Sequence, residues 1–295
     1  MARLAGIELG GTKTIVVLGE PGQLAARHIL ATTTPEETLA TAAAVLRAWQ
    51  AEAPLDAVGI ASFGPLQLRP DVPGFGHMLQ TPKTGWSGAD IVGAIAGTVD
   101  CPVSIDTDVN AAALAEFHHG AGRGCSIIVY LTIGTGVGGG IVAGDAPLHG
   151  RMHPEIGHQQ FRRMAGDGFA GICPFHGDCI EGLVSGPALA ARFGCHPATV
   201  AGGDARWNAP AEDLAQLLAS LLLTVSPDRI IIGGGVAMKQ PHLIATAAAR
   251  VPDLLACYLP DVDAARIDDI VCLPALGEDA GPLGAIEIGW RAIAV

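Results

Sequence analysis

The sequence predicts an α/β fold with two domains that share one cleft, and three observations support this. Apolar β-like runs alternate with stretches of helical periodicity, which is typical of sheets covered by helices. Two glycine-rich turns follow apolar runs about 125 residues apart, which indicates duplicated halves. The chain has 295 residues, enough for two domains and a large core.

The predicted elements of the first half begin with a hairpin. Ile7–Leu9 forms one strand, Gly10–Lys13 the turn, and Thr14–Leu18 the returning strand. Thr34-Pro35-Glu36-Glu37 is a capping box with proline at the first helical position. An amphipathic helix that ends before Pro54 follows, with its apolar positions at helical spacing: Leu39, Ala42, Ala43, Leu46 and Trp49.

Three further features complete that half. Ala57–Ser62 is a short buried strand leading to Phe63-Gly64-Pro65. Residues 66–89 are irregular and rich in proline and glycine, and irregular segments of that length are usually functional. Val103–Ile105 is a strand that runs through Asp106-Thr107-Asp108 into a helix at Val109–His119.

The second half starts with the second hairpin, Ile127–Thr132, the turn Gly134–Gly140, and Ile141-Val142. Residues 143–182 form an insertion rich in glycine, histidine and cysteine. A long buried helix follows, marked by the leucines at its apolar positions: Leu214, Leu217, Leu218, Leu221 and Leu222. A strand from Asp228 ends in a third glycine turn at Gly233–Gly235, and Gly281–Gly284 opens an apolar helix, Ala285–Ala294.

Composition excludes several classes of function. The net charge is −12 with no basic block, so nucleic acid and anionic membranes are poor partners. No apolar run reaches about 18 residues, and the chain enters a strand almost at once, so we expect no signal peptide or membrane span and a cytoplasmic protein. Seven scattered cysteines, an odd number, fit a reducing compartment better than a disulfide framework.

The first glycine turn is a candidate phosphate site. Glycines let backbone N–H groups approach a phosphate, and Thr12 and Lys13 suit its terminal oxygens. Glu8 could hold Mg²⁺ directly or through water. The usual P-loop string is absent, so a tight hairpin with a surface lysine is the alternative. The second turn favours the phosphate interpretation.

Asp108 is the candidate catalytic base. It lies where a strand ends and a helix begins, and in phosphoryl transfer an aspartate orients the attacking hydroxyl and accepts its proton. The helix start should keep it ionised at neutral pH. A simple N-cap aspartate is the structural alternative. Asp106 is the rival base.

A Cys-x2-His-x2-Cys segment predicts a structural metal site. Cys173, His176 and Cys179 offer three ligands and His158 a fourth, which matches a closed tetrahedral zinc site. His153 or His149 could replace His158. Two buried thiols with surface histidines are the alternative.

Glu155 and Glu181 flank this cluster, and both could accept hydrogen bonds from sugar hydroxyls. Solvated loop glutamates are the common alternative. A carboxylate pair could also indicate glycoside hydrolysis, but the nucleotide-type turns make that a weak competitor.

Together these motifs resemble those of the ROK sugar kinases, and within them the bacterial fructokinase branch, over essentially the whole chain. Four segments carry the resemblance: Glu8–Lys13; Asp106–Glu116; Thr132–Gly140; and Pro154–His158 followed by Cys173, His176, Cys179 and Glu181. Three departures from the wider family stand out. Thr107 stands where many family members have an asparagine before the base. Glu8 stands where many have an aspartate. The pattern C-x2-H-x2-C takes the place of a longer cysteine pattern. The last variant, like Gln80–Trp86, looks like the fructokinase branch.

The resemblance implies two ribonuclease-H-like (actin/hexokinase-type) domains with an active-site cleft between them, and ATP, Mg²⁺ and structural Zn²⁺. It carries the base onto Asp108 and the metal ligands onto His158, Cys173, His176 and Cys179. The expected sugar contacts are Gly64, Pro65, Thr107, Asp108, Glu155, His158 and Glu181. The expected ATP contacts are Gly6, Glu8, Gly10, Gly11, Thr12, Lys13, Thr132, Gly134, Thr135, Gly136, Gly138, Gly139, Gly140, Gly186, Pro187 and Gly234. A homodimer is the family expectation.

We therefore expect one domain from residues 1–115 plus a C-terminal helix at about 281–295, and another from 116–280 with the zinc loop at about 145–182. The predicted activity is ATP-dependent conversion of D-fructose to D-fructose 6-phosphate. A glucose, mannose or N-acetylhexosamine kinase of the same family is the alternative. A sugar-sensing ROK regulator is disfavoured, because the first hairpin starts by Ile7 and leaves no room for a preceding helix-turn-helix.

Overall fold

The structure, a computed structural model, describes residues 2–294 and divides into two compact units. Unit 1 comprises Met1–Arg123, Asp145–Pro154 and Leu276–Val295, and unit 2 comprises Gly124–Gly144 and Glu155–Ala275. The sequence-based boundaries at 115/116 and 280/281 therefore differ from the structural division by several residues, and part of the expected zinc loop, 145–154, groups with unit 1. Met1 and Val295, included in the expected domains, lie outside the described residues.

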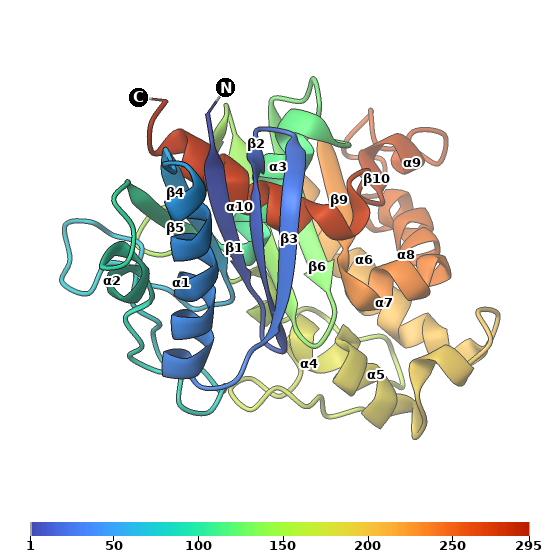
Figure 1. Ribbon diagram of the computed structural model, residues 1–295. Helices are drawn as coiled ribbons and strands as arrows, with labels where there is room; N and C mark the ends of the chain where they lie inside the picture. Colours follow the sequence, from blue (N-terminus) through green and yellow to red (C-terminus); the bar gives the residue numbers. More distant parts are fainter. Residues whose placement is uncertain (1, 295) are drawn as a thin grey trace. The chain divides into compact units, whose positions relative to one another are not determined.

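Unit 1 is built on a five-stranded mixed sheet of order β3-β2-β1-β4-β5 (Figure 1). Its strands are β1 (Leu4–Leu9), β2 (Lys13–Glu20), β3 (Gln23–Ala31), β4 (Ala57–Ser62) and β5 (Val103–Thr107). β1 pairs antiparallel with β2 and parallel with β4, which in turn is parallel to β5. The carboxyl ends of β1, β4 and β5 therefore meet at one edge, where ligand sites of such sheets lie.

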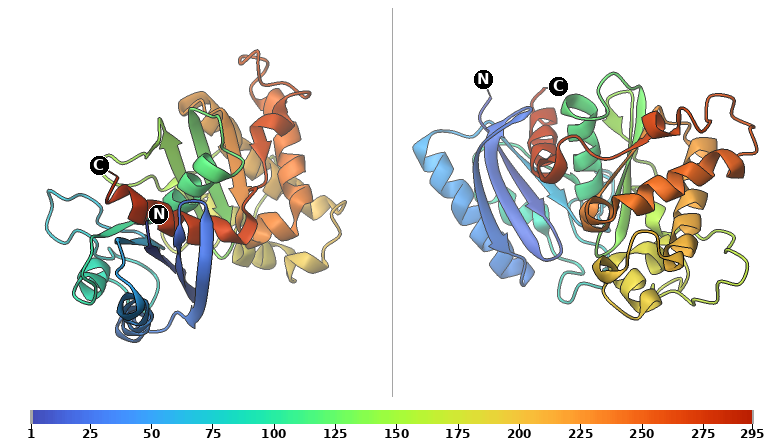
Figure 2. Two further views of the ribbon diagram at one scale, coloured as in Figure 1. Left: turned by 45° about the horizontal axis from the view of Figure 1, so that its top comes forward. Right: turned by 90° about the vertical axis from the view of Figure 1, so that its right-hand side faces the viewer.

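The two faces of this sheet follow from strand alternation. Ala5, Ile7 and Leu9 pack into one core with α1 (Pro35–Glu52) and α2 (Ile91–Ala96), whereas Leu4 packs with Ile286 of α10 (Ala280–Arg291). In the right-hand view of Figure 2, α1 and α10 lie on opposite sides of the blue strands. α3 (Asp108–His119) packs beside α10. The even-numbered positions of β1 thus face α10.

The second five-stranded sheet has the order β10-β9-β6-β7-β8, and all of its strands except β8 belong to unit 2. Its strands are β6 (Ile127–Ile133), β7 (Val137–Ala143), β8 (Ala146–Pro147), β9 (Arg229–Gly233) and β10 (Val271–Cys272). β6 pairs antiparallel with β7 and parallel with β9. The second predicted hairpin is therefore confirmed, but its turn is Gly134–Gly136 rather than Gly134–Gly140, because β7 already begins at Val137.

The helices of unit 2 are α4 (Ile180–Val184), α5 (Gly186–Phe193), α6 (Asn208–Thr224), α7 (Gly234–Lys239), α8 (Pro241–Leu254) and α9 (Ile267–Ile270). α6 and α8 pack against each other and cover the apolar residues of β6 and β9 in a single core. The predicted leucine-rich helix is the central part of α6. The insertion before α4 contains only one short 3₁₀ turn, Ile156–His158, within unit 2.

Several predicted boundaries need correction. The C-terminal helix runs from Ala280 to Arg291, not from Ala285 to Ala294, because Gly281–Gly284 is already helical. The third glycine turn is the start of α7, with Gly234 at φ 87° where a Cβ would come within 2.6 Å of the Ile133 carbonyl oxygen. The sequence-based element list omitted β3, α2, α5 and α8.

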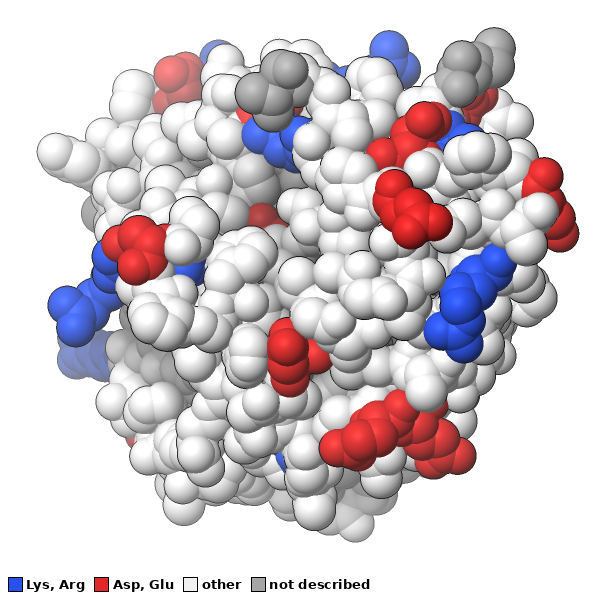
Figure 3. Space-filling view, turned by 60° about the vertical axis from the view of Figure 1, so that its left-hand side comes forward, with Lys and Arg blue, Asp and Glu red and all other residues white. Residues whose placement is uncertain are grey.

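Charge is dispersed on the face shown in Figure 3, where Lys and Arg form no extended block among the residues that the structure describes. None of the helices within residues 2–294 combines the length and the apolar character needed to cross a membrane.

Candidate functional site

Asp108 is the first residue of α3 and follows the last residue of β5, as the sequence predicts. The N-cap is not Asp108 but Thr107, whose Oγ1 accepts a hydrogen bond of 3.2 Å from the Asn110 N–H. The N-cap alternative for Asp108 is therefore wrong. The Asp108 Oδ1 accepts only a local hydrogen bond, 2.9 Å from the Val109 N–H.

Burial controls the acidity of Asp108. It raises the pKa of this carboxyl from 3.8 to about 6, although hydrogen bonds from the Val109 and Asp108 N–H groups lower it. The N–H groups at the helix start therefore lower the pKa, as expected, but the loss of hydration on burial raises it by more. At pH 7 roughly nine-tenths of the group is still ionised. A carboxylate with a pKa close to the working pH suits a general base.

Asp106, the rival base, is already occupied. Its Oδ1 accepts hydrogen bonds from the Thr107 N–H (2.7 Å) and Asn110 Nδ2 (2.8 Å), and its Oδ2 lies 3.0 Å from His149 Nε2. This interaction raises the pKa of His149. Asp106 therefore holds the backbone of the β5–α3 junction, and Asp108 remains the better base. No pattern in the sequence points to His149 in this role.

Glu8 faces the N-terminus of α10, because even-numbered positions of β1 point to that helix. A Cβ on Gly281 would lie 2.1 Å from Glu8 Oε1, so the carboxylate occupies the space that a side chain at this position would take. Burial first, and the charge of Asp108 second, raise the pKa of Glu8 from 4.5 to about 7. Its Oε2 is buried and has no hydrogen-bond partner among residues 2–294. Such an orphaned carboxylate oxygen beside a second acid fits a cation site.

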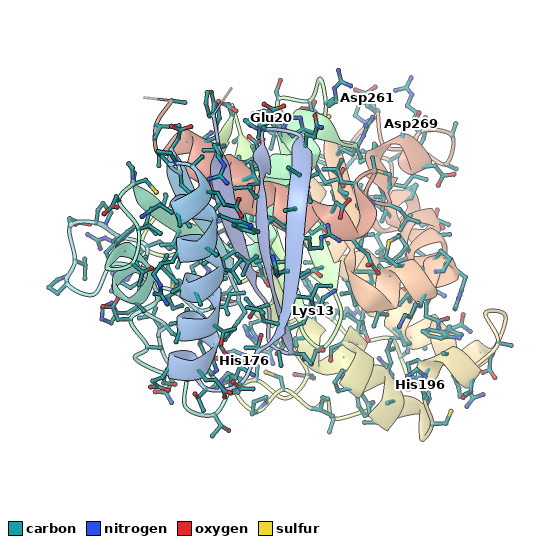
Figure 4. All side chains as sticks on the ribbon, viewed as in Figure 1. Lys13, Glu20, His176, His196, Asp261 and Asp269 are labelled. Carbon is teal, nitrogen blue, oxygen red and sulfur yellow. The ribbon has the colours of Figure 1, made fainter. Side chains whose placement is uncertain are left out.

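The first glycine turn is held by Thr32, the residue that follows β3. Thr32 Oγ1 donates to the Gly10 carbonyl oxygen (2.8 Å), and its N–H donates to that of Thr12 (3.0 Å). Lys83 Nζ, from the irregular segment, lies 2.6 Å from the Gly11 carbonyl oxygen. Thr12 and Lys13 are exposed, and Figure 4 shows Lys13 at the end of the β1–β2 hairpin.

Gly6 is the first of the expected ATP contacts along the chain. It lies inside β1, four residues before the turn, and is buried against α10. A Cβ at Gly6 would come within 2.9 Å of the Ala285 Cβ and the Val17 Cγ2. Its lack of a side chain therefore serves the close packing of strand and helix.

The Gly64–Pro65 segment, an expected sugar contact, follows β4 and contains a cis peptide bond. His153 secures it, because its Nε2 accepts a hydrogen bond of 3.0 Å from the Leu66 N–H. Burial lowers the pKa of His153, which keeps the ring neutral and able to accept. The sequence proposed His153 as an alternative zinc ligand, but its place is in unit 1 beside this loop.

The second glycine turn is bound to the start of α5. The Gly186 N–H donates to the Gly134 carbonyl oxygen (2.8 Å), and Glu181 Oε2 accepts from the Val137 N–H (3.0 Å). Two of the expected ATP contacts, Gly139 and Gly140, lie within β7. Gly139 lies under Ile156, whose Cδ1 would be 2.6 Å from a Cβ there, and Gly140 is buried in β7. Gly138 also lies in β7, and Thr132 is paired with it in β6.

A pocket of about 520 Å³ opens beside this turn, wholly within unit 2. Its lining is Gly134, Thr135, Gly186, Pro187, Ala190, His196, Pro197, Ala198, Gly235, Val236, Lys239 and Gln240. The sequence-based set contains the first four, but it names Gly234 where the lining residue is Gly235. His196, labelled in Figure 4, Lys239 and Gln240 were not anticipated. No local motif marks them.

The Cys/His cluster forms in unit 2 from the four side chains that the sequence singles out. Ligand atoms of His158, Cys173, His176 and Cys179 all lie within 4.8 Å of one another. The Cys173 Sγ is 3.7 Å from His158 Nδ1 and from His176 Nδ1, and the Cys179 Sγ is 3.6 Å from His158 Nδ1. Tetrahedral Zn²⁺ with ordinary bond lengths would place sulfur and nitrogen roughly 3.5 Å apart. The donor set therefore fits the ion. His149 and His153 do not join it.

An ionic network anchors the same insertion elsewhere. Asp167 pairs with Arg163 and Arg192, and Arg192 Nη1 also lies 2.8 Å from Asp213 Oδ2 in α6. Asp213 is almost fully buried. Glu155 and Glu181, the expected sugar contacts of unit 2, border the insertion. Glu155 is exposed at the start of the 3₁₀ turn that carries His158, and Glu181 lies in the first turn of α4.

Comparison with known proteins identifies the family. The ROK family model matches residues 4–291. The chain belongs to the ROK family. It is 39% identical over 294 residues to a fructokinase of Zymomonas mobilis, covering 97% of this chain and 96% of the relative. It is 35% identical over 292 residues to a fructokinase of Pediococcus pentosaceus, covering 98% of each.

Solved structures of this ROK chain's relatives agree with its fold. A ROK hexokinase from Thermus thermophilus has a TM-score of 0.75 and 27% identity and covers 99% of each chain. A ROK family glucokinase from Streptomyces griseus, solved with glucose and AMPPNP, has a TM-score of 0.74 and 25% identity, and covers 98% of this chain and 100% of that one. The actin/hexokinase-type α/β fold expected from the motifs is confirmed, with two five-stranded mixed sheets.

Proposed function

We propose that the protein is an ATP-dependent sugar kinase that converts D-fructose to D-fructose 6-phosphate. The observation that carries the proposal is the Asp108 carboxylate at the start of α3, which accepts hydrogen bonds from the Val109 and Asp108 N–H groups and has its pKa raised to about 6. Curated fructokinases that align over nearly the whole chain support fructose as the acceptor. Glucose, mannose or N-acetylhexosamine kinases, and a regulator without catalysis, are not favoured.

In this proposal Asp108 orients the primary hydroxyl of the sugar and accepts its proton late in the transfer. The transition state of phosphoryl transfer is loose, so positioning and charge stabilisation matter more than the strength of the base. Asp106 and Thr107 fix the backbone from which Asp108 projects. The hydrogen of the Thr107 hydroxyl stays available to a sugar oxygen, because the hydroxyl oxygen only accepts in the cap.

ATP is assigned to both glycine turns and to the pocket of unit 2. The turns Gly10–Lys13 and Gly134–Gly136 offer backbone N–H groups and hydroxyls to phosphate oxygens. The apolar walls of the pocket suit a purine and ribose. Glu8 is the side chain that would hold Mg²⁺, directly or through water, and the ion would neutralise charge on the transferred phosphate. Its buried, unpartnered Oε2 supports this.

The remaining assignments also belong to the proposal. Sugar hydroxyls are bound by Gly64, Pro65, Glu155, His158 and Glu181 in addition to the β5–α3 junction. Structural Zn²⁺ is bound by His158, Cys173, His176 and Cys179, which would order an insertion that has little regular structure. We further propose a cytoplasmic homodimer whose only other partners are its small-molecule substrates.

A coupled assay of ADP release over a panel of hexoses tests the activity. Fructose should give the highest kcat/KM, and Asp108→Asn should reduce turnover by at least about a thousandfold. Asp253→Asn, at an exposed position of α8, is the matched control. Preference for glucose, mannose or an N-acetylated sugar would assign one of the alternatives, and absence of any hexose-dependent release, with DNA binding in a gel-shift test, would favour a regulator.

A further inference from the structure

Gln240 stands out among the polar residues that line the pocket of unit 2. The other polar side chains of the lining, those of Thr135, His196 and Lys239, belong to exposed residues, whereas Gln240 is only 8% exposed. Its side-chain amide makes no hydrogen bond within residues 2–294. Five residues in that part of the chain have a side-chain polar atom that is fully buried and has no hydrogen-bond partner: Glu8, His77, Asn110, Arg163 and His242. Gln240 is not one of them. Gln240 thus lines the pocket, and its side-chain amide keeps some accessible surface.

The backbone of Gln240 is held rigidly between two helices. Gln240 ends α7 and precedes α8, where its N–H donates to the Val236 carbonyl oxygen (2.8 Å) and its carbonyl oxygen accepts from the Leu243 N–H (3.0 Å). Its side-chain amide carries an oxygen that accepts and an NH₂ group that donates, so it can pair with a base edge that offers the reverse. Ligand pockets place a few polar groups among apolar walls, and an amide with no partner among residues 2–294 can serve a bound ligand in this way.

The position of Gln240 along α7 matches the base end of a nucleotide. Gly235, at the start of α7, lies against the turn Gly134–Gly136, because a Cβ on Gly134 would be 3.8 Å from the Gly235 N atom. Gln240 is five residues further on, about 7.5 Å along a helix. The lining residues Pro187, Ala190, Pro197 and Val236 are apolar and suit the faces of a flat ring.

We propose that Gln240 reads the edge of the purine base and sets the preference for adenine nucleotides. Its carbonyl oxygen accepts from the 6-amino group of adenine, and its NH₂ donates to the neighbouring ring nitrogen, as glutamine does when it reads adenine in nucleic acids. This assignment deepens the proposed function, because it takes the pocket as the site of the phosphate donor. Gln240 would thus supply the polar contact to the base, whereas the glycine turns are assigned to the phosphates.

Binding of nucleoside diphosphates, measured by titration calorimetry with Mg²⁺ and without sugar, tests the proposal. Wild-type protein should bind ADP roughly 3- to 10-fold more tightly than purine riboside diphosphate, which lacks only the 6-amino group. Gln240→Leu should bind ADP more weakly and lose the difference between the two ligands. Gln216→Leu, in α6 where the amide bonds Glu212, is the matched control and should behave as wild type.

The ligand comparison on wild-type protein needs no substitution, so it can overturn the proposal even if Gln240→Leu folds poorly. Equal affinity of wild-type protein for ADP and purine riboside diphosphate would overturn the proposal. So would a folded Gln240→Leu that keeps the wild-type discrimination. Failure of the proposed function is separate: it would appear as absent hexose phosphorylation while adenine recognition by Gln240 persists.

Discussion

The carboxylate of Glu181 accepts a hydrogen bond of 3.0 Å from the backbone N–H of Val137. Glu181 stands two residues after Cys179, and Val137 is the first residue after the Gly134–Gly136 turn. One side chain therefore joins the Cys/His cluster to the turn that we assign to phosphate. Gly136 provides the room, since a Cβ there would come within 2.6 Å of Glu181 Oε2.

Two substitutions of Glu181 should separate its roles. Glu181→Ala removes the acceptor for the Val137 N–H and should raise KM for ATP roughly 3- to 10-fold, the effect of one lost hydrogen bond. Glu181→Gln keeps an acceptor oxygen and should leave KM for ATP near the wild-type value. Both should raise KM for fructose if the carboxylate binds a sugar hydroxyl. Steady-state kinetics with each substrate varied measure this, and Glu212→Ala is the control. An unchanged KM for ATP in Glu181→Ala would exclude the bracing role.

Removal of the metal should affect the insertion more than the rest of unit 2. We expect about one Zn²⁺ per chain by elemental mass spectrometry, and none in Cys179→Ser. Without the ion, KM for fructose should rise and protease should cut between Pro154 and Asp178. The Arg192–Asp167 and Arg192–Asp213 pairs should still hold the segment near α6.

Cys257→Ser, at an exposed cysteine outside the cluster, should keep both the metal and the activity. Full activity in protein shown to be free of metal would contradict the structural role of the cluster.

Local signals predicted the elements that carry the site. The Thr34 cap and the proline after it mark the start of α1 to the residue, and glycines mark both hairpin turns. β3 was not predicted because Arg27, His28 and Ile29 are all exposed on this edge strand, so its pattern does not alternate. α8 is rich in alanine and carries Pro252 near its end, which hid its periodicity.

The site itself was only partly predictable, because several of its contacts join residues far apart in sequence. Gly6 shares the glycine pattern of the first turn, yet in the folded protein it packs against Ala285. Glu8 acquires its raised pKa from burial under Gly281 and from Asp108, and neither distance can be read from spacing. Gln240 belongs to no motif, and only the pocket around it singles it out.

Asp108→Asn should stabilise the protein while it abolishes turnover. The folded-state pKa of Asp108, about 6, lies above its unfolded value of 3.8, so the ionised form is disfavoured in the folded state. The destabilisation is absent below pH 3.8, grows between the two pKa values and is complete above pH 6. Its size is on the order of 1–3 kcal/mol.

Thermal unfolding of Asp108→Asn and wild type at pH 4.5 and pH 7.5 measures this. The variant should gain more in Tm at pH 7.5, and Asp253→Asn should show no such difference. The same pKa predicts that wild-type kcat/KM falls as the pH drops through about 6. A variant that is less stable than wild type at pH 7.5 would show that the Asp108 carboxylate is held by favourable contacts instead.

Gly281→Ala should damage the site through Glu8. In a helix, alanine is normally about 1 kcal/mol more favourable than glycine, so stability would be expected to rise. Here the new methyl group would overlap the Glu8 carboxylate, and we expect a lower Tm and a higher Mg²⁺ requirement for activity. Glu8→Asp shortens the side chain by one methylene and withdraws it from the helix. The double variant Gly281→Ala/Glu8→Asp should therefore recover stability beyond the sum of the single effects, a coupling that a double-mutant cycle measures. Strictly additive effects on Tm and on Mg²⁺ dependence would show that Gly281 and Glu8 do not share this space, and that the glycine serves only the start of α10.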